Sequence, residues 1–498
     1  MLLCLPNLEV LDGMNVDDDG PKHICFKCAS ETYLSAEIEQ DGKQKECSYC
    51  GQTQACIPIE ELADRIESAF DDHYIRTSDQ PDSWQQSLLS DRESDYEWER
   101  EGQSVLEAIE EAAVIPQEAA ADVLEILDDR HDDFDAAAMG EETEFSSDTY
   151  YEMKGASAQG LHEEWRYFER SLKTEARFFS RSASELLARI FGSIHTLKTR
   201  PRHPLVVDAG PSRRLTHLYR ARVFQSEDKL NEALCRPDLH LGSPPTRFAS
   251  AGRMNARGIS VFYGATNASV ALAEVRPPVG SKVVVAKFAI TRPSRLLDLT
   301  ALDDVQDGGS IFDPSLKGRL ERVAFLRSLG QLMTRAVMPD DEAFDYLATQ
   351  AIADFLATES EPRLDGIIFV SAQSKEGRNV VLFHKSARVR AMELPEGTEI
   401  NAHTGYGTED GWEIDYGVNE VVPKAEPPVP KGEMDTLPSF IPHFAPSYSS
   451  HRADDDYRDT ALRVDPASIE VHHVNSVKVY SKRFAVSRNR SEKQYSKF

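Results

Sequence analysis

The sequence lacks any apolar run that approaches the roughly 20 residues needed to cross a bilayer as a helix. Its first ten residues, MLLCLPNLEV, contain no basic segment and are soon followed by three aspartates, which argues against a secretory signal. With 40% apolar and 8% aromatic residues, the 498-residue chain can still bury cores, and its length favours two to four domains. These features predict a cytoplasmic protein with no membrane partner.

Basic residues are scarce: 56 Lys and Arg stand against 84 Asp and Glu, a formal net charge of −28. Residues 81–150 contain 22 acids and three Arg, so about two-thirds of this excess lies in one stretch. Such a stretch repels phosphate backbones, and we expect no DNA partner. We interpret it as a solvated helical surface, the alternative being a nucleic-acid mimic or a mask for a basic partner. Residues 475–498 have seven basic residues and one acid, typical of a solvated tail or a docking strip.

Cysteine is also infrequent, with seven in the chain, but four of them are regularly spaced as two CxxC pairs separated by 18 residues. The spacing of Cys25, Cys28, Cys47 and Cys50 predicts one tetrahedral Zn²⁺ site. Two disulfides or four unrelated thiols are the alternatives, and disulfides are disfavoured in the cytoplasm. Four thiolates leave no open position, so this zinc is structural. We expect His23 to be a bystander, and three cysteines have no evident partner: Cys4, Cys56 and Cys235.

Helical periodicity dominates the chain between residues 58 and 205, where strand patterns are almost absent. The apolar spacing predicts helices over 58–72, 105–113, 119–127 and 161–197. We therefore predict a zinc-ribbon-like segment over 1–57 and an all-α domain over 58–205, which ends in a linker at 199–204.

Short β-rich runs alternate with helical patterns after residue 205, which predicts a mixed α+β domain over 206–395. The expected strands are 259–262, 282–290, 366–370 and 380–383, and the expected helices are 268–275, 316–336 and 341–358. Residues 396–498 are interpreted as a linker and a C-terminal extension. Within it, 421–455 are Pro-rich and acidic, and 469–486 alternate well enough for a strand or hairpin before the basic tail.

Three segments of the α+β region resemble the signature blocks of the RES family: LYRAR (218–222), AGRMNARGISVFYGATNASVALAEVRP (251–277) and DGIIFVSAQSKEGRNVVLF (365–383). The family is named for an Arg, a Glu and a Ser, which correspond by position to Arg220, Glu274 and Ser371. The order and spacing of three blocks make this resemblance more specific than any single block.

The second block also resembles the family pattern GRWN…YxA…E, which adds Arg253, Asn255 and Tyr263. Met254 stands where an aromatic residue is usual, a departure that Met can accommodate in the same apolar space. The preceding zinc-ribbon-like and helical segments are similar to the HEPN/RES-type N-terminal half of larger RES proteins, so the all-α domain over 58–205 is expected to be HEPN-like and regulatory.

The resemblance implies a fold similar to that of ADP-ribosyltransferases and an enzyme that destroys NAD⁺ by hydrolysis or phosphorolysis of the nicotinamide–ribose bond. It also implies a toxin-like role in a toxin–antitoxin or defence setting, with an antitoxin or immunity protein and a homo-oligomer as the partners to consider. Neither a GxGxxG fingerprint nor a P-loop is present. NAD⁺ is therefore expected to be the substrate and not a borrowed cofactor.

The residue types suit this chemistry. A carboxylate such as Glu274 can stabilise the oxocarbenium character that develops at the ribose, and arginines such as Arg220 and Arg253 can bind the pyrophosphate. Tyr263 could stack on nicotinamide, and Ser371 follows the buried strand GIIFV. Asn255 and Asn379 complete the substrate-binding set, with Asn379 expected to hold the Ser371 loop. Taken singly, each residue also has an ordinary interpretation as a surface, core or strand-end side chain.

Two alternatives stay open at this point. The first is a mono-ADP-ribosyltransferase, which would use the same site to modify a macromolecule. The second is a HEPN-type ribonuclease using Arg189 and His195, or a zinc-dependent binding module with an inactive RES domain. We further expect the 205 residues ahead of the RES domain to gate the active site or to drive assembly.

Overall fold

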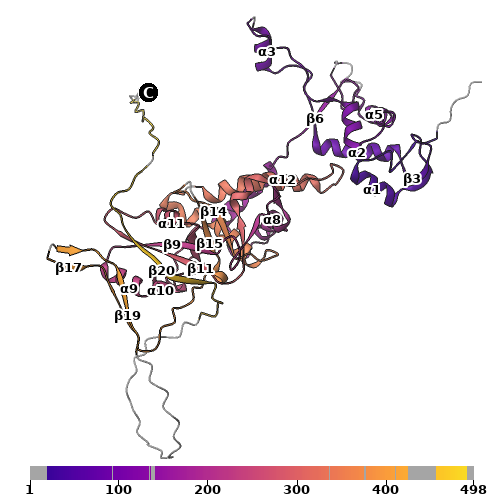
Figure 1. The fold of residues 1–498 in the computed structure, drawn as a ribbon. Coiled ribbons are helices and arrows are strands. Elements are labelled where there is room, and N and C mark those ends of the chain that lie inside the picture. Colours follow the sequence, from indigo (N-terminus) through magenta and orange to yellow (C-terminus); the bar gives the residue numbers. More distant parts are fainter. Residues whose placement is uncertain are drawn as a thin grey trace, which may run out of the picture. The chain divides into compact units, whose positions relative to one another are not determined.

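The computed structural model (Figure 1) describes residues 20–91, 93–133, 135, 139, 141–335, 337–374, 377–409, 411–423, 456–479 and 481–490. The chain divides into two compact units. The first contains the residues up to His162 together with Gln306–Phe325, and the second contains Glu163–Val305 and the residues from Leu326 onward. Cys4, nearly all of the Pro-rich segment predicted at 421–455 and the last eight residues of the basic tail lie outside the described residues.

The first unit begins with the cysteine pairs and continues into short helices. Its elements are β1 (His23–Cys25), α1 (Thr32–Asp41), β2 (Lys43–Glu46), β3 (Thr53–Pro58), α2 (Ile59–His73), β4 (Tyr74–Arg76), α3 (Ser83–Ser90), β5 (Gln103–Ser104), α4 (Val105–Ala113), α5 (Gln117–His131) and β6 (Tyr150–Met153). The predicted helices at 58–72, 105–113 and 119–127 correspond to α2, α4 and α5. The apolar positions that predicted α2 are all buried, as the 3.6-residue period requires: Ile59, Leu62, Ile66 and Phe70.

One hydrophobic core serves the cysteine-bearing segment and the helices together. Ile24, Leu34 and Ile38 are buried in the same cluster as Ile66 and Leu127. The boundary predicted at residue 57 therefore does not separate two cores, and the zinc-ribbon-like segment folds as part of a larger unit.

The expectation of an all-α domain over 58–205 is wrong in one respect, because β4, β5 and β6 form a small antiparallel sheet with β6 in the centre. Aromatic packing holds this sheet to the helices: the Tyr74 ring stacks on Phe70 with centroids 4.3 Å apart, and Tyr151 packs edge-on against Phe70 at 5.2 Å. Strands of two to four residues carry too short an alternation to be distinguished from loops in the sequence.

The helix predicted over 161–197 is divided into α7 (Gln159–Thr174) and α8 (Arg181–Phe191). Ser180 caps α8 by accepting a hydrogen bond from the Ala183 amide. Phe179, expected on the apolar face, lies in the connection and is almost fully exposed. Residues 199–204 form a tight turn, in which the Thr199 amide donates to the His203 carbonyl at 2.9 Å, and not an extended linker.

The second unit contains an eight-stranded sheet in the order β20-β11-β9-β10-β15-β14-β12-β8, in which β12 and β14 form the only parallel pair. Its strands are β8 (Val206–Ala209), β9 (His217–Phe224), β10 (Phe262–Ala265), β11 (Lys282–Ile290), β12 (Ser294–Asp298), β14 (Gly366–Val370), β15 (Arg378–Leu382) and β20 (Leu462–His473). Minor strands are β7 (Lys198–Thr199), β13 (Val305–Gln306), β16 (Glu399–His403), β17 (Tyr406–Thr408), β18 (Gly411–Glu413) and β19 (Gly417–Val421). The later helices are α9 (Glu227–Cys235), α10 (Pro237–His240), α11 (Ala268–Glu274), α12 (Leu316–Thr334), α13 (Glu342–Asp345) and α14 (Leu347–Thr358).

The predicted strands at 282–290 and 366–370 are confirmed as β11 and β14. The strand predicted at 259–262 instead begins at Phe262, because the carbonyls of Ile259 and Ser260 bind side chains, those of Asn255 and His384, and do not enter the sheet. This mixture of a sheet and covering helices agrees with the predicted α+β class (Figure 1).

The predicted C-terminal extension contributes an edge strand to this sheet. β20 pairs antiparallel with β11 from Ile290↔Leu462 to Lys282↔His473. Leu462 and Val464 are buried in the core beneath the sheet. The domain boundary expected at residue 395 therefore falls inside one continuous sheet.

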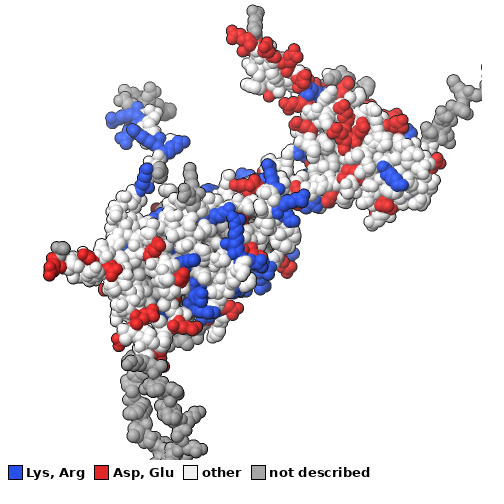
Figure 2. Space-filling model, in the orientation of Figure 1, with Lys and Arg blue, Asp and Glu red and all other residues white. Residues whose placement is uncertain are grey.

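Acidic side chains predominate on the face of the first unit seen in Figure 2, which agrees with the charge of residues 81–150. Some of these acids are paired: Arg100 makes a two-pronged ion pair with Glu142, with both contacts at 2.7 Å. None of the helices in the described ranges combines the length and apolarity that a membrane span requires.

Candidate functional site

A cavity of about 380 Å³ lies in the second unit, beside the point where β9 meets β10. These two strands share a single register pair, Tyr219 and Ala265, and the cavity is lined from both of them. Its volume is within the range of small-molecule sites. The lining consists of Tyr219, Arg220, Ala221, Arg253, Tyr263, Gly264, Ala265, Ala271, Glu274, Val275, Arg276, Thr334, Tyr346, Phe369, Val370, Ala372 and Asn379.

Glu274 is the last residue of α11 and the only carboxylate among these lining residues. The helix begins at Asn267, whose side-chain oxygen accepts a hydrogen bond from the Val270 amide at 2.8 Å, as expected for an N-cap. The Oε1 atom of Glu274 accepts hydrogen bonds from Ser371 Oγ at 2.5 Å and from Asn379 Nδ2 at 2.8 Å. Within the described part of the chain Oε2 has no such partner. One carboxylate oxygen is therefore fixed by hydrogen bonds, and the other is available to contact a ligand.

The hydroxyl of Ser371 is fully used in holding that carboxylate. It donates its proton to Glu274 and accepts hydrogen bonds from the amides of Gln373 and Ser374, both at 3.1 Å. A serine has one proton and two acceptor positions, and all three are engaged here. The geometry makes Ser371 a positioning residue that aims Glu274, and Asn379, which is also buried, acts on the same oxygen.

Arg220 brings an unpaired cation to the cavity. Its Nη1 atom is buried without a hydrogen-bond partner among the described residues, and its guanidinium lies over the Phe262 ring at 4.8 Å. Burial, and secondarily the charge of Arg222, lowers the pKa of Arg220 to about 10, so the group is still cationic at neutral pH. A buried cation without a counter-charge is unfavourable, and an anionic ligand would supply the missing partner.

Arg253 also lines the cavity, but both of its terminal nitrogens already donate to backbone carbonyls. Nη1 binds the Met333 carbonyl at 3.0 Å and Nη2 binds the Arg335 carbonyl at 2.9 Å. Its guanidinium also stacks on the Tyr346 ring at 4.9 Å. Arg253 therefore caps the C-terminal end of α12, where a cation is favoured by the helix dipole.

Tyr263, which lines the cavity, is hydrogen-bonded to Asn255, which does not. The Tyr263 hydroxyl donates to Asn255 Oδ1 at 2.9 Å and accepts from the Met254 amide at 3.0 Å. Asn255, which is not among the lining residues, donates to three backbone carbonyls of its own loop: those of Ser250, Ala256 and Ile259. Burial raises the pKa of Tyr263 to about 12, so its hydroxyl stays protonated. Because that hydroxyl already donates to Asn255 and accepts from Met254, the ring is the part of the side chain left for a ligand.

Among the lining residues that were not singled out from the sequence, three are tyrosines or arginines: Tyr219, Arg276 and Tyr346. Tyr219 and Arg276 lie within the matched blocks, one position before Arg220 and two positions after Glu274, so their proximity to those residues was the available signal. Tyr346 comes from the connection between α13 and α14, and no local pattern distinguishes it from other tyrosines.

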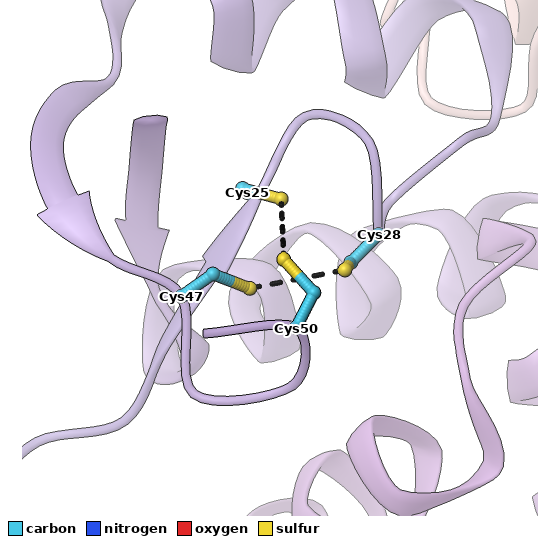
Figure 3. Close-up of side chains that lie close together, drawn as sticks. All are labelled: Cys25, Cys28, Cys47 and Cys50. Carbon is cyan, nitrogen blue, oxygen red and sulfur yellow. Dashed lines mark hydrogen bonds between the residues drawn. The ribbon is translucent and has the colours of Figure 1, made fainter. Parts of the chain in front are cut away.

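The first unit contains a separate site built from four thiols (Figure 3). The sulfur atoms of Cys25, Cys28, Cys47 and Cys50 all lie within 4.8 Å of one another. Cys25 and Cys50 are 3.7 Å apart and Cys28 and Cys47 are 3.8 Å apart. A tetrahedral metal with bonds of about 2.3 Å requires sulfur separations of about 3.8 Å, so the four thiols are positioned to bind a metal ion.

The remaining candidates lie outside both sites. His23 is not part of the thiol cluster, and the Cys56 thiol donates to the Lys45 carbonyl at 3.3 Å. Arg189 on α8 is exposed and pairs with Glu164, and His195 is exposed in a short 3-10 helix. The suggestion that Arg189 and His195 form a ribonuclease pair stays a prediction.

Comparison with protein families gives two matches. The model of the RES domain matches residues 218–402, which include Arg220, Glu274 and Ser371, and the model of HEPN/RES N-terminal domain 1 matches residues 40–186. Among curated proteins and solved structures, no match to the chain was found. The expected similarity to the fold of ADP-ribosyltransferases therefore stays a prediction.

Proposed function

We propose, from the premise that this chain is a RES-domain protein with a HEPN/RES N-terminal domain, that its second unit breaks the nicotinamide–ribose bond of NAD⁺. The RES family is associated with NAD-related toxin function. The observation that carries the proposal is the arrangement of Glu274, which Ser371 and Asn379 hold by one oxygen in a cavity that also contains the unpaired Arg220.

The chemistry follows from where charge develops. As the bond between the ribose carbon and the nicotinamide nitrogen breaks, its electron pair leaves with neutral nicotinamide and positive charge grows on the ribose ring. A carboxylate fixed beside that ring stabilises charge that is present mainly in the transition state. The oxygen of water, or of phosphate, then forms the new bond to the ribose carbon, and in hydrolysis a proton is released.

Arg220 provides the complementary contact to the other end of the reacting molecule. Within the described ranges its buried Nη1 has no hydrogen-bond partner, and a phosphate oxygen would satisfy both the missing hydrogen bond and the uncompensated charge. Because the guanidinium is held over Phe262 before any ligand arrives, little side-chain freedom is lost on binding.

The first unit is proposed to have a supporting role. Its thiol cluster suits a structural Zn²⁺, because four thiolates leave no coordination position for a substrate. We also propose a cytoplasmic setting, in which an antitoxin or immunity protein, self-association or the first unit itself restrains the enzyme.

The test is to incubate the purified full-length protein with NAD⁺ and to measure nicotinamide release with and without phosphate. Glu274→Gln keeps an oxygen that can accept from Ser371 and Asn379 but removes the charge, so we expect a loss of about 10²-fold or more. Glu232→Gln is the matched control, because it makes the same substitution at an exposed glutamate on α9, and it is expected to retain wild-type rates.

Equal rates for the wild type and Glu274→Gln would contradict the proposal. Transfer of labelled ADP-ribose onto protein or nucleic acid would instead indicate a mono-ADP-ribosyltransferase. RNA cleavage that is lost in His195→Ala would indicate the ribonuclease alternative.

A further inference from the structure

Arg276 is an exposed arginine in the cavity lining, and its backbone conformation is unusual. It has φ of +42°, in the left-handed region that favours glycine, and lies two positions after Glu274, the last residue of α11. Its amide donates to the Ala273 carbonyl at 3.2 Å, so it occupies the position where helices commonly end in a glycine. The backbone by itself would therefore prefer a residue without a side chain, which suggests that the Arg276 guanidinium has a use.

The three cavity arginines differ in how far their donors are occupied. Arg253 donates from both terminal nitrogens to backbone carbonyls, whereas Nη1 of Arg220 has no partner among the residues that the structure describes. Arg276 is intermediate between them, because in the described part of the chain its guanidinium donors have a side-chain partner but no backbone partner. With the Gln373 amide oxygen turned toward it, Nη2 and Nε of Arg276 donate to that oxygen at 2.9 and 3.1 Å.

A neutral amide oxygen is a weaker partner for a guanidinium than a phosphate, because a phosphate adds a negative charge of its own and can accept two parallel hydrogen bonds from an arginine. A phosphate oxygen could therefore displace Gln373 from Arg276. Gln373 also belongs to the turn that donates a backbone amide to Ser371, so Arg276 contacts the segment that positions Glu274.

We propose that Arg276 binds one phosphate of a diphosphate substrate at the rim of the cavity while Arg220 binds the other inside it. This inference rests on the proposed function and deepens it, because it assigns the pyrophosphate contacts to Arg220 and Arg276, not to Arg220 and Arg253. The substrate class is then a nucleoside diphosphate ester, and a mononucleotide with one phosphate would make only one of the two contacts.

The test measures ligand binding separately from catalysis. Titration calorimetry on the full-length protein compares ADP-ribose, which has two phosphates, with AMP, which has one. The informative variant is Arg276→Gly, because glycine suits the positive φ and is expected to keep or raise the thermal unfolding midpoint. We expect its Kd for ADP-ribose to rise about tenfold and its Kd for AMP to change less than twofold. Arg257→Gln, which removes an exposed arginine outside the cavity lining, is expected to match the wild type.

An unchanged Kd for ADP-ribose in Arg276→Gly would overturn the proposal, as would an equal loss for ADP-ribose and AMP, or a wild type that binds neither ligand. A wild type that binds ADP-ribose through Arg276 but releases no nicotinamide from NAD⁺ would contradict the proposed function and leave this assignment standing. The two failures are therefore distinguishable.

Discussion

At the scale of single residues, the cavity shows how a hydroxyl can orient a carboxylate without itself being free to react. Ser371 has no free donor or acceptor, because its proton goes to Glu274 and its oxygen receives two amides. Its contribution depends on keeping the Glu274 carboxylate in one orientation, together with Asn379. This arrangement distinguishes it from a serine nucleophile, whose oxygen must be free to attack.

If Ser371 acts only by orienting Glu274, substitutions at these two residues are expected to have non-additive effects on the rate of nicotinamide release. Ser371→Ala is expected to lower the kcat for nicotinamide release about tenfold with little change in KM, since it removes orientation and not substrate contact. In a Glu274→Gln background the same change is expected to have almost no further effect, and a double-mutant cycle of initial rates measures this. Additive losses would indicate that Ser371 acts independently of Glu274.

At the scale of elements, the C-terminal strand β20 is the clearest departure from expectation. It begins 60 residues beyond the end of the RES match at residue 402, yet it pairs along β11 and buries Leu462 and Val464 in the core of the second unit. An uncovered β11 would present an unpaired edge, which is a site for aggregation. We infer that the catalytic unit needs this strand for its stability.

Leu462→Ala is expected to destabilise the second unit by about 2–5 kcal/mol, because it leaves a cavity in a packed core. The neighbouring Arg463→Ala removes an exposed side chain from the same strand and is expected to change stability by less than about 0.5 kcal/mol. Differential scanning calorimetry of the full chain measures both. Similar unfolding midpoints for the two variants would show that β20 is dispensable.

At the scale of the whole molecule, the thiol cluster and the candidate catalytic cavity belong to different compact units. The thiols lie in the first unit, whose core contains residues from the cysteine-bearing segment and from α2 to α5. Loss of a structural zinc removes on the order of 10 kcal/mol of folding free energy, which is comparable to the whole stability of a typical domain. We therefore expect metal removal to unfold the first unit without dismantling the cavity.

Elemental analysis is expected to find one zinc ion per chain, and Cys47→Ser or a strong chelator is expected to remove it and to abolish the calorimetric transition of the first unit. Nicotinamide release by the second unit is expected to persist. Cys235→Ser, which changes a thiol outside the cluster, is the matched control. A metal-free protein that keeps both transitions would contradict a structural role for the site.

The elements of this protein that could be predicted from the sequence are those specified by a local residue pattern. The CxxC pairs, the helical period of α2 and the strands β11 and β14 are short-range patterns, and the structure places each of them as expected. Short strands such as β4 and β6 could not be predicted, because their stability comes from aromatic packing against Phe70 and not from an alternation of their own.

The sequence by itself determined the two classes of site, through the types and spacing of the cysteines and of Arg220, Glu274 and Ser371. Only the tertiary structure decided what each side chain does there. Arg253 caps a helix that is distant in the chain, Asn255 supports its own loop, and Arg276 faces the cavity from a position of positive φ. None of these three placements can be deduced from the residue types alone. The sequence shows which chemical groups are present. Which of their hydrogen-bond donors have partners depends on how the folded chain packs around them.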